Sequence, residues 1–135
     1  MFQIFRYSIA YILIIAALLA VPAEGNAQNY RAQDVIAVDK QIRFKRGEIF
    51  AFVTGRIARG TTHHYRVRAR AGQRMAVVLK SGRRTSFTVY GNQTGILEGA
   101  DGVTQAVVEL PETGEFLIEI GTDAAASYRL EVAIK

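Results

Sequence analysis

The sequence predicts an all-β domain, an antiparallel β-sandwich or jelly roll of about seven or eight strands. Apolar residues recur at every second position along most of the chain, whereas the helical period is almost absent. Short turn signals rich in Gly, Asn and Asp separate these alternating runs. Since each run has one apolar face, a second sheet must cover it, and two covered sheets form a sandwich.

The first four strands are expected where the alternation is continuous. They are Glu48 to Ile57, with Ile49, Ala51, Val53 and Ile57 inward; His63 to Ala69, with Tyr65, Val67 and Ala69 inward; Gln73 to Ser81, with Met75, Val77 and Leu79 inward; and Thr85 to Tyr90, with Phe87 and Val89 inward.

Three more strands are expected in the C-terminal half. They are Thr104 to Leu110; Glu115 to Gly121, with Phe116, Ile118 and Ile120 inward and Glu115 and Glu119 outward; and a last strand in which Tyr128, Leu130, Val132 and Ile134 alternate with polar or small residues.

The N-terminal third lacks this alternation. Residues Asn29 to Asp39 have no strong period, so we expect a flexible lead-in over 28–40. An edge strand is expected at Gln41 to Phe44, where the sandwich domain, 41–135, begins.

The first 27 residues have the features of a secretory signal peptide. Arg6 precedes the apolar run Ile9 to Val21, which is too short to cross a bilayer comfortably, and small residues follow. We expect cleavage after Ala27, with Ala23 as the other site and an uncleaved anchor as the alternative. The mature protein would be periplasmic or secreted, without a stable membrane span.

Cysteine is absent from the sequence. A chain that enters an oxidising compartment without disulfides must rely on its hydrophobic core. The absence also excludes thiol catalysis, thiolate metal sites and lipidation at a cysteine.

Two turns have residues with a direct structural explanation. Gly72 lies between two strands, where a tight reversal favours a residue without a Cβ. Pro111 ends a strand because it has no N–H, and Gly114 lets the chain turn back.

These motifs, read in order, resemble the bacterial pre-peptidase C-terminal (PPC) family of β-sandwich domains. The matching positions are Phe44, Gly47, Gly55, Tyr65, Ala69, Gly72-Gln73, Leu110-Pro111, Thr113-Gly114, Tyr128 and Leu130. The free-standing, signal-peptide-bearing form of this size is similar to the periplasmic inhibitors of g-type lysozyme. The resemblance covers Phe44 to Lys135 and implies a non-catalytic protein that binds a protein partner, such as a lysozyme.

The two halves of the domain have opposite charge. Nine Lys or Arg and no acid lie between Ile49 and Leu97, whereas eight acids and two bases lie between Glu98 and Lys135. In particular, Arg66, Arg68 and Arg70 recur at every second position. They form either a solvated face paired with carboxylates such as Glu119 and Glu131, or a face that binds an anion.

Three functional hypotheses follow. The first is a protein-binding, lysozyme-inhibitor-like envelope protein that uses the loops "RGTTHHY" and "SGRRT". The second is a module for anionic glycans or surface polymers, and the third is an accessory domain without a ligand. The candidate binding residues are Arg59, His63, His64, Tyr65, Arg66, Arg68, Arg70, Arg83 and Arg84.

The sequence gives little support for metal binding, catalysis or nucleic-acid binding. Adjacent strand residues point to opposite faces, so His63 and His64 cannot easily share a metal ion. No Ser lies in a nucleophile elbow, and Glu109, Glu115 and Glu119 read as ordinary outward acids. We expect no enzyme activity, no cofactor and no nucleic-acid partner, because the aromatic positions face the core; the oligomeric state is left open.

Overall fold

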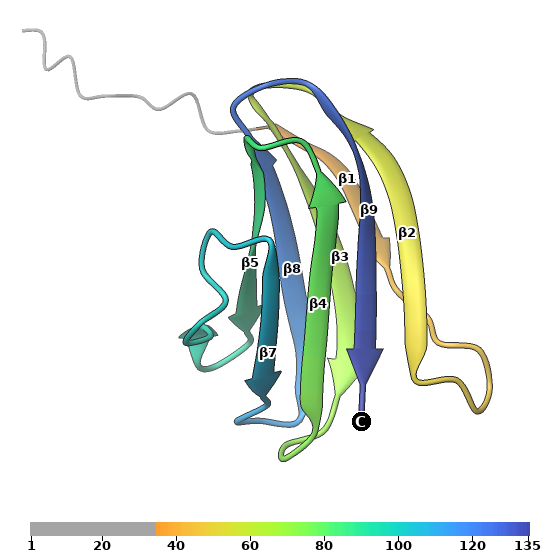
Figure 1. Ribbon diagram of the computed structural model, residues 1–135. Coiled ribbons are helices and arrows are strands. Elements are labelled where there is room, and N and C mark those ends of the chain that lie inside the picture. The colour runs from red at the N-terminus through yellow and green to blue at the C-terminus, as the bar shows by residue number, and fades with distance from the viewer. Residues whose placement is uncertain (1–34) are drawn as a thin grey trace, which may run out of the picture. The chain divides into compact units, whose positions relative to one another are not determined.

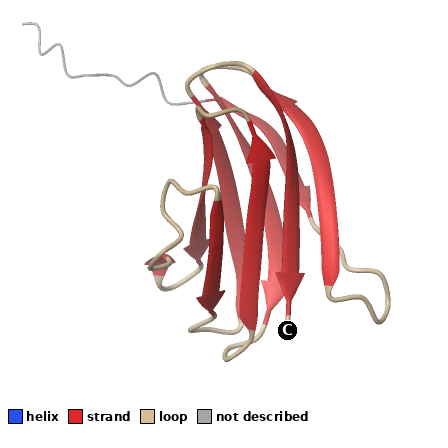
Figure 2. Cartoon of the chain, viewed as in Figure 1, coloured by secondary structure: helices blue, strands red, loops and turns tan. Residues whose placement is uncertain are grey.

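The computed structural model describes residues 35–135, in which every regular element is a strand (Figure 2). This part of the chain therefore contains no helix that could cross a membrane. The strands are β1 (Val35–Gln41), β2 (Phe50–Ile57), β3 (Thr61–Ala69), β4 (Arg74–Ser81), β5 (Thr85–Gly91), β6 (Gly95–Ile96), β7 (Gln105–Glu109), β8 (Gly114–Thr122) and β9 (Ala126–Ile134).

The strands form two sheets that pack face to face (Figure 1). Sheet A has the order β1-β3-β8-β5-β6, and sheet B has the order β2-β9-β4-β7. Neighbours in each sheet are antiparallel except β1, which runs parallel to β3. The predicted β-sandwich is confirmed.

The alternation of the sequence predicts the core well. All the residues expected inward from β3, β4, β5, β8 and β9 are buried, as is Ile57 at the end of β2. Ala51 and Val53 face the same interior but are only half-buried, because β2 is an edge strand. Ile49 was expected in the core and is exposed, since it lies in the loop before β2.

The edge strand lies earlier than the sequence predicted. It spans Val35–Gln41, so it begins within the expected lead-in, 28–40, and ends at the first residue of the expected strand; residues 42–44 are irregular. Six of its seven residues are exposed, so hydrophobic periodicity gave no signal for it. Backbone pairing with β3, from Val35 opposite Thr61 to Gln41 opposite Arg66, forms this strand instead. The expected signal peptide lies outside the described residues.

The two turns singled out in the sequence contact each other. The Ala71 N–H donates to Thr113 Oγ1 at 2.9 Å, and the Gly72 N–H donates to the Leu110 carbonyl at 2.8 Å. Gly72 has φ of 83°, which favours a residue without a Cβ. These turn residues therefore join the β3–β4 and β7–β8 connections, a structural role.

Candidate functional site

The nine candidate residues do not form one site. Arg59, Arg83 and Arg84 lie in turns at one end of the sandwich. Three others, His64, Arg66 and Arg68, lie on the outer face of sheet A, and Arg70 follows the far end of β3. His63 and Tyr65 point into the interior.

Three connections meet at the end that carries Arg59 (Figure 1). We call this the loop end: residues 58–60 between β2 and β3, 82–84 between β4 and β5, and 123–125 between β8 and β9. Backbone hydrogen bonds tie the loops to their neighbours. The Asp123 N–H donates to the Arg84 carbonyl at 3.1 Å, and the Val35 N–H donates to the Gly60 carbonyl at 3.2 Å.

The loop end is strongly basic. Arg59, Arg83 and Arg84 are exposed there, and Asp123 is the acid in the three loops. Arg56, near the end of β2, adds a fourth exposed guanidinium that the sequence reasoning did not single out. Its outward position in the alternation of β2, just before the "RGTT" loop, was the available signal. Within residues 35–135 none of these four arginines forms an ion pair.

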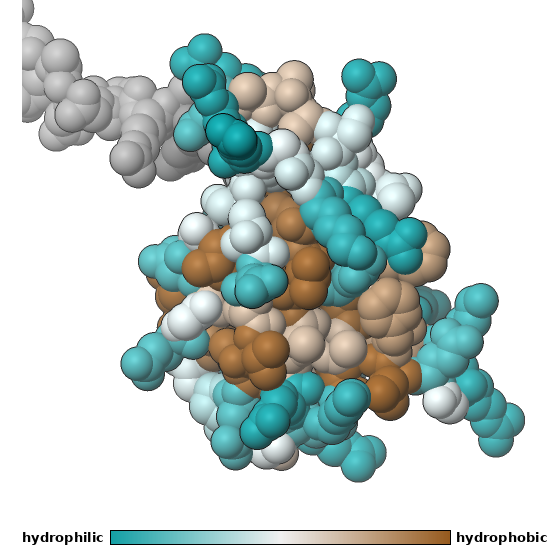
Figure 3. Space-filling model, in the orientation of Figure 1, coloured by the Kyte–Doolittle hydropathy of each residue, from teal (hydrophilic) through white to brown (hydrophobic). Residues whose placement is uncertain are grey.

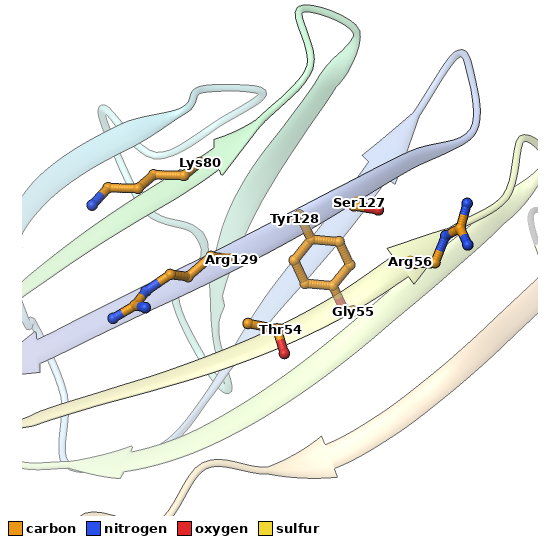
Figure 4. Close-up of a pocket in the computed structure, with 7 residues that line it drawn as sticks. All are labelled: Thr54, Gly55, Arg56, Lys80, Ser127, Tyr128 and Arg129. Carbon is orange, nitrogen blue, oxygen red and sulfur yellow. The ribbon is translucent and has the colours of Figure 1, made fainter.

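A shallow hollow lies on the outer face of sheet B beside the loop end (Figure 4). Its volume is about 540 Å³ and it is open to solvent. It is lined by Thr54, Gly55, Arg56, Lys80, Ser127, Tyr128 and Arg129. Three cations and three hydroxyl-bearing side chains therefore line a space of a size and charge suited to an acidic side chain.

One carboxylate partly neutralises this hollow. Glu131 Oε1 accepts a hydrogen bond from Lys80 Nζ at 2.9 Å and lies 3.0 Å from Arg129 Nε. The hydrogen bond from Lys80 lowers the pKa of Glu131, although burial opposes it. The Arg129 guanidinium also lies 3.8 Å from the ring centroid of Phe52. Arg56 therefore remains the cation of the hollow without a carboxylate partner in the described part of the chain.

On the outer face of sheet A, carboxylates of neighbouring strands largely neutralise the charge of Arg66. Its guanidinium donates two hydrogen bonds of 2.9 Å to Asp39 and one of 3.2 Å to Glu115. This pairing lowers the pKa of Asp39. Arg68 lies opposite the same Glu115 in the β3–β8 register, without an ion pair of its own among residues 35–135.

The sequence analysis expected Glu119 and Glu131 as the carboxylates beside these arginines, and the structure places other acids there. Glu119 bonds His64 instead, and Glu131 lies on the other sheet. The reason is topology: β3 lies between β1 and β8, so Asp39 of β1 and Glu115 of β8 are its neighbours.

His63 and His64 point in opposite directions, as the strand geometry predicted. A hydrogen bond of 2.6 Å joins His63 Nδ1 and Tyr128 Oη between the sheets. A bond of 2.8 Å joins His64 Nε2 and Glu119 on the outer face of sheet A. No group of three metal-binding side chains occurs in residues 35–135.

Comparison with solved structures gives clear matches. The first is PliG of Aeromonas hydrophila, a periplasmic lysozyme inhibitor of g-type lysozyme, with 24% identity over 73% of this chain and 97% of that chain and a TM-score of 0.63. PliG of Salmonella Typhimurium matches with 20% identity over 72% and 98% of the two chains and a TM-score of 0.59.

A mutant of the Escherichia coli PliG matches with 17% identity, 72% and 97% coverage and a TM-score of 0.60. The chain has the fold of these inhibitors. No family model matches the sequence, and no curated protein matches it. The pre-peptidase C-terminal assignment stays a prediction.

The match covers at least 97% of each of these three solved chains. At these identities the likeness establishes the architecture, and the function must be argued from the site.

Proposed function

We propose that this protein is an exported, non-catalytic binding protein that inhibits a lysozyme of the g type by docking its basic loop end on the enzyme. The observation that carries the proposal is the convergence of Arg56, Arg59, Arg83 and Arg84 at one end of a fold shared with g-type lysozyme inhibitors.

The chemistry of such a contact is direct. Glycoside hydrolases place carboxylate side chains in their substrate cleft. Exposed guanidinium groups bind carboxylates through paired N–H donors, with more geometric specificity than an ammonium group has. Loops that carry several arginines without a carboxylate partner in residues 35–135 are therefore suited to an acidic cleft.

The place of action follows from the expected signal peptide at 1–27 and from the compartment of the matched inhibitors. A periplasmic or secreted protein would meet a lysozyme that enters the cell envelope. The polyanion alternative is weaker, because Asp39 and Glu115 already bind Arg66.

An inhibition assay tests the proposal. The purified protein should reduce the activity of a g-type lysozyme on bacterial cell walls, and the triple variant Arg59→Ala, Arg83→Ala, Arg84→Ala should inhibit at least about tenfold less well. The matched control is Arg68→Ala, Arg70→Ala, which removes exposed arginines away from the loop end. Unchanged lysozyme activity at micromolar excess of the protein rejects inhibition, and equal losses in both variants reject the loop end as the contact.

A further inference from the structure

The outer face of sheet B carries an apolar row that crosses four strands. Phe50 of β2 lies opposite Ala133 of β9, Ala133 lies opposite Ala76 of β4, and Ala76 lies opposite Val107 of β7. In the next row, Phe52 of β2 and Val78 of β4 lie on either side of Glu131 of β9. We call these six residues the apolar band: Phe50, Phe52, Ala76, Val78, Val107 and Ala133.

The band does not belong to the core, because the interior residues of these strands point the other way. Val107 is 67% exposed, Phe52 52% and Phe50 43%. In Figure 3, brown and tan atoms cross the middle of this face, and teal atoms lie above and below them. Exposed apolar surface gathered in this way marks an interaction site more often than scattered residues do.

Cations border the band on both sides. Toward the loop end lie Arg56, Lys80 and Arg129. On the opposite side lie Arg74 and Lys135, whose backbones are paired. The β1–β2 loop that leads into Phe50 adds Arg43, Lys45 and Arg46, all exposed and without an ion pair in the described chain.

Acids are few on this face. Glu131 forms ion pairs with both Lys80 and Arg129, and Glu109 lies opposite Arg74 at the β4–β7 edge. Glu48 is the acid of the β1–β2 loop, against its three cations. The band is therefore an apolar surface with positively charged borders.

We propose that the apolar band binds the surface of a membrane that contains anionic lipids. The phosphate groups of such lipids match the cations on both borders, and the phenyl rings and valines match the boundary between headgroups and acyl chains. Each basic side chain near an anionic membrane contributes about 1 kcal/mol, so several together give measurable reversible binding.

The charges disfavour a second copy as the occupant, because two bands stacked face to face would bring positive borders together. The shape disfavours a protein anchor, since the hollow between β4 and β7 is shallow, about 290 Å³, and open. A lipid surface needs no anchoring pocket. Arg56 lies at the border of the band and also belongs to the loop end, so the test of this proposal changes Phe50 and Phe52, which the proposed inhibition does not use.

Cosedimentation with lipid vesicles tests whether the apolar band binds an anionic membrane. The full purified protein should bind vesicles of mixed phosphatidylglycerol and phosphatidylcholine at least about tenfold more tightly than vesicles of phosphatidylcholine alone. Raising the salt concentration from about 0.1 M to about 0.5 M should weaken the binding, because the Debye length shortens. The double variant Phe50→Ser, Phe52→Ser should lose it.

Ile96→Ser is the matched control, since Ile96 is exposed to a similar degree on sheet A. A second readout uses Phe52→Trp, because the chain contains no Trp; its fluorescence should shift to shorter wavelength when anionic vesicles are added.

Three outcomes overturn the proposal. The first is equal binding to both vesicle types or to neither. The second is unchanged binding by the double variant while its thermal unfolding matches that of the wild type. The third is a wild-type dimer in solution that the double variant converts to a monomer, which would assign the band to a second copy. Lysozyme inhibition should be the same for wild type and double variant, so the two proposals fail separately.

Discussion

The hydroxyl of Tyr128 lies where a side chain at position 55 would have to be. Gly55 of β2 pairs with Tyr128 of β9, and a Cβ on Gly55 would be 2.6 Å from Tyr128 Oη and 2.7 Å from Cζ. From this position Tyr128 Oη bonds both His63 and Tyr65 of sheet A. A glycine on an edge strand therefore makes room for a polar link between the two sheets.

Gly55→Ala should destabilise the fold by about 1–3 kcal/mol, because the new methyl group would displace a buried ring. Urea unfolding measures this. The matched control is Gly82→Ala, in an exposed turn where a Cβ meets no atom within 4 Å. Equal unfolding midpoints for the two variants would contradict the close approach seen at Gly55.

Tyr128→Phe should also cost about 1–3 kcal/mol, because it removes the partner of two buried polar groups and fills no space in return. Burial and the bond to Tyr65 raise the pKa of Tyr128, so the phenol stays protonated. Tyr90→Phe is the comparison, since the Tyr90 hydroxyl has a single contact of 3.5 Å with Glu119. If Tyr90→Phe proves as costly as Tyr128→Phe, the link between sheets has no special role.

Folding stability should fall in mild acid through His63. Burial, and secondarily the charge of Lys40, lowers the pKa of His63 from its ordinary 6.5. Above pH 6.5 the imidazole is neutral in both states, and its contribution is complete. As the pH falls below 6.5, the unfolded chain binds a proton before the folded chain does, so stability declines down to the folded pKa.

His63→Gln should reduce this pH dependence, measured by urea unfolding at about pH 8 and about pH 5.5. The wild type should lose more stability between the two values than the variant. The same loss in both proteins would show that other groups titrate instead.

Heparin affinity should report the neutralisation of Arg66. The double variant Asp39→Asn, Glu115→Gln keeps the size of both side chains but removes the charges that hold the guanidinium. It should elute from a heparin column at higher salt than the wild type, because Arg66, Arg68 and Arg70 then present unopposed charge.

Glu98→Gln is the control for this experiment, since it removes one exposed acid away from β3. Each removed acid raises the net charge, so the comparison is made per charge. If the double variant gains no more than twice the shift of Glu98→Gln, the acids beside Arg66 do not mask a binding face.

Part of the candidate site was predicted from the sequence, and part was decided by the tertiary structure. The turn residues Arg59, Arg83 and Arg84 were identified from the sequence, because exposed loops carry binding groups. The sequence could not predict that these turns meet at one end, because β2, β4 and β8 are brought to that end by the pairing of strands in the two sheets. Arg66 was identified as a candidate anion binder, and the structure supplies its two carboxylates from strands far away in sequence.

The sequence by itself determined the all-β class, most strand positions and the inward residues, because alternation of apolar side chains is a local property that directly reflects burial of one face. The tertiary structure decided the rest. Strand β1 forms through backbone pairing with β3. The order of the strands in sheet A determines which carboxylates lie beside Arg66. The residues of the apolar band lie side by side only because the strands of sheet B pair in this register. Each depends on contacts between distant segments, which no local pattern encodes.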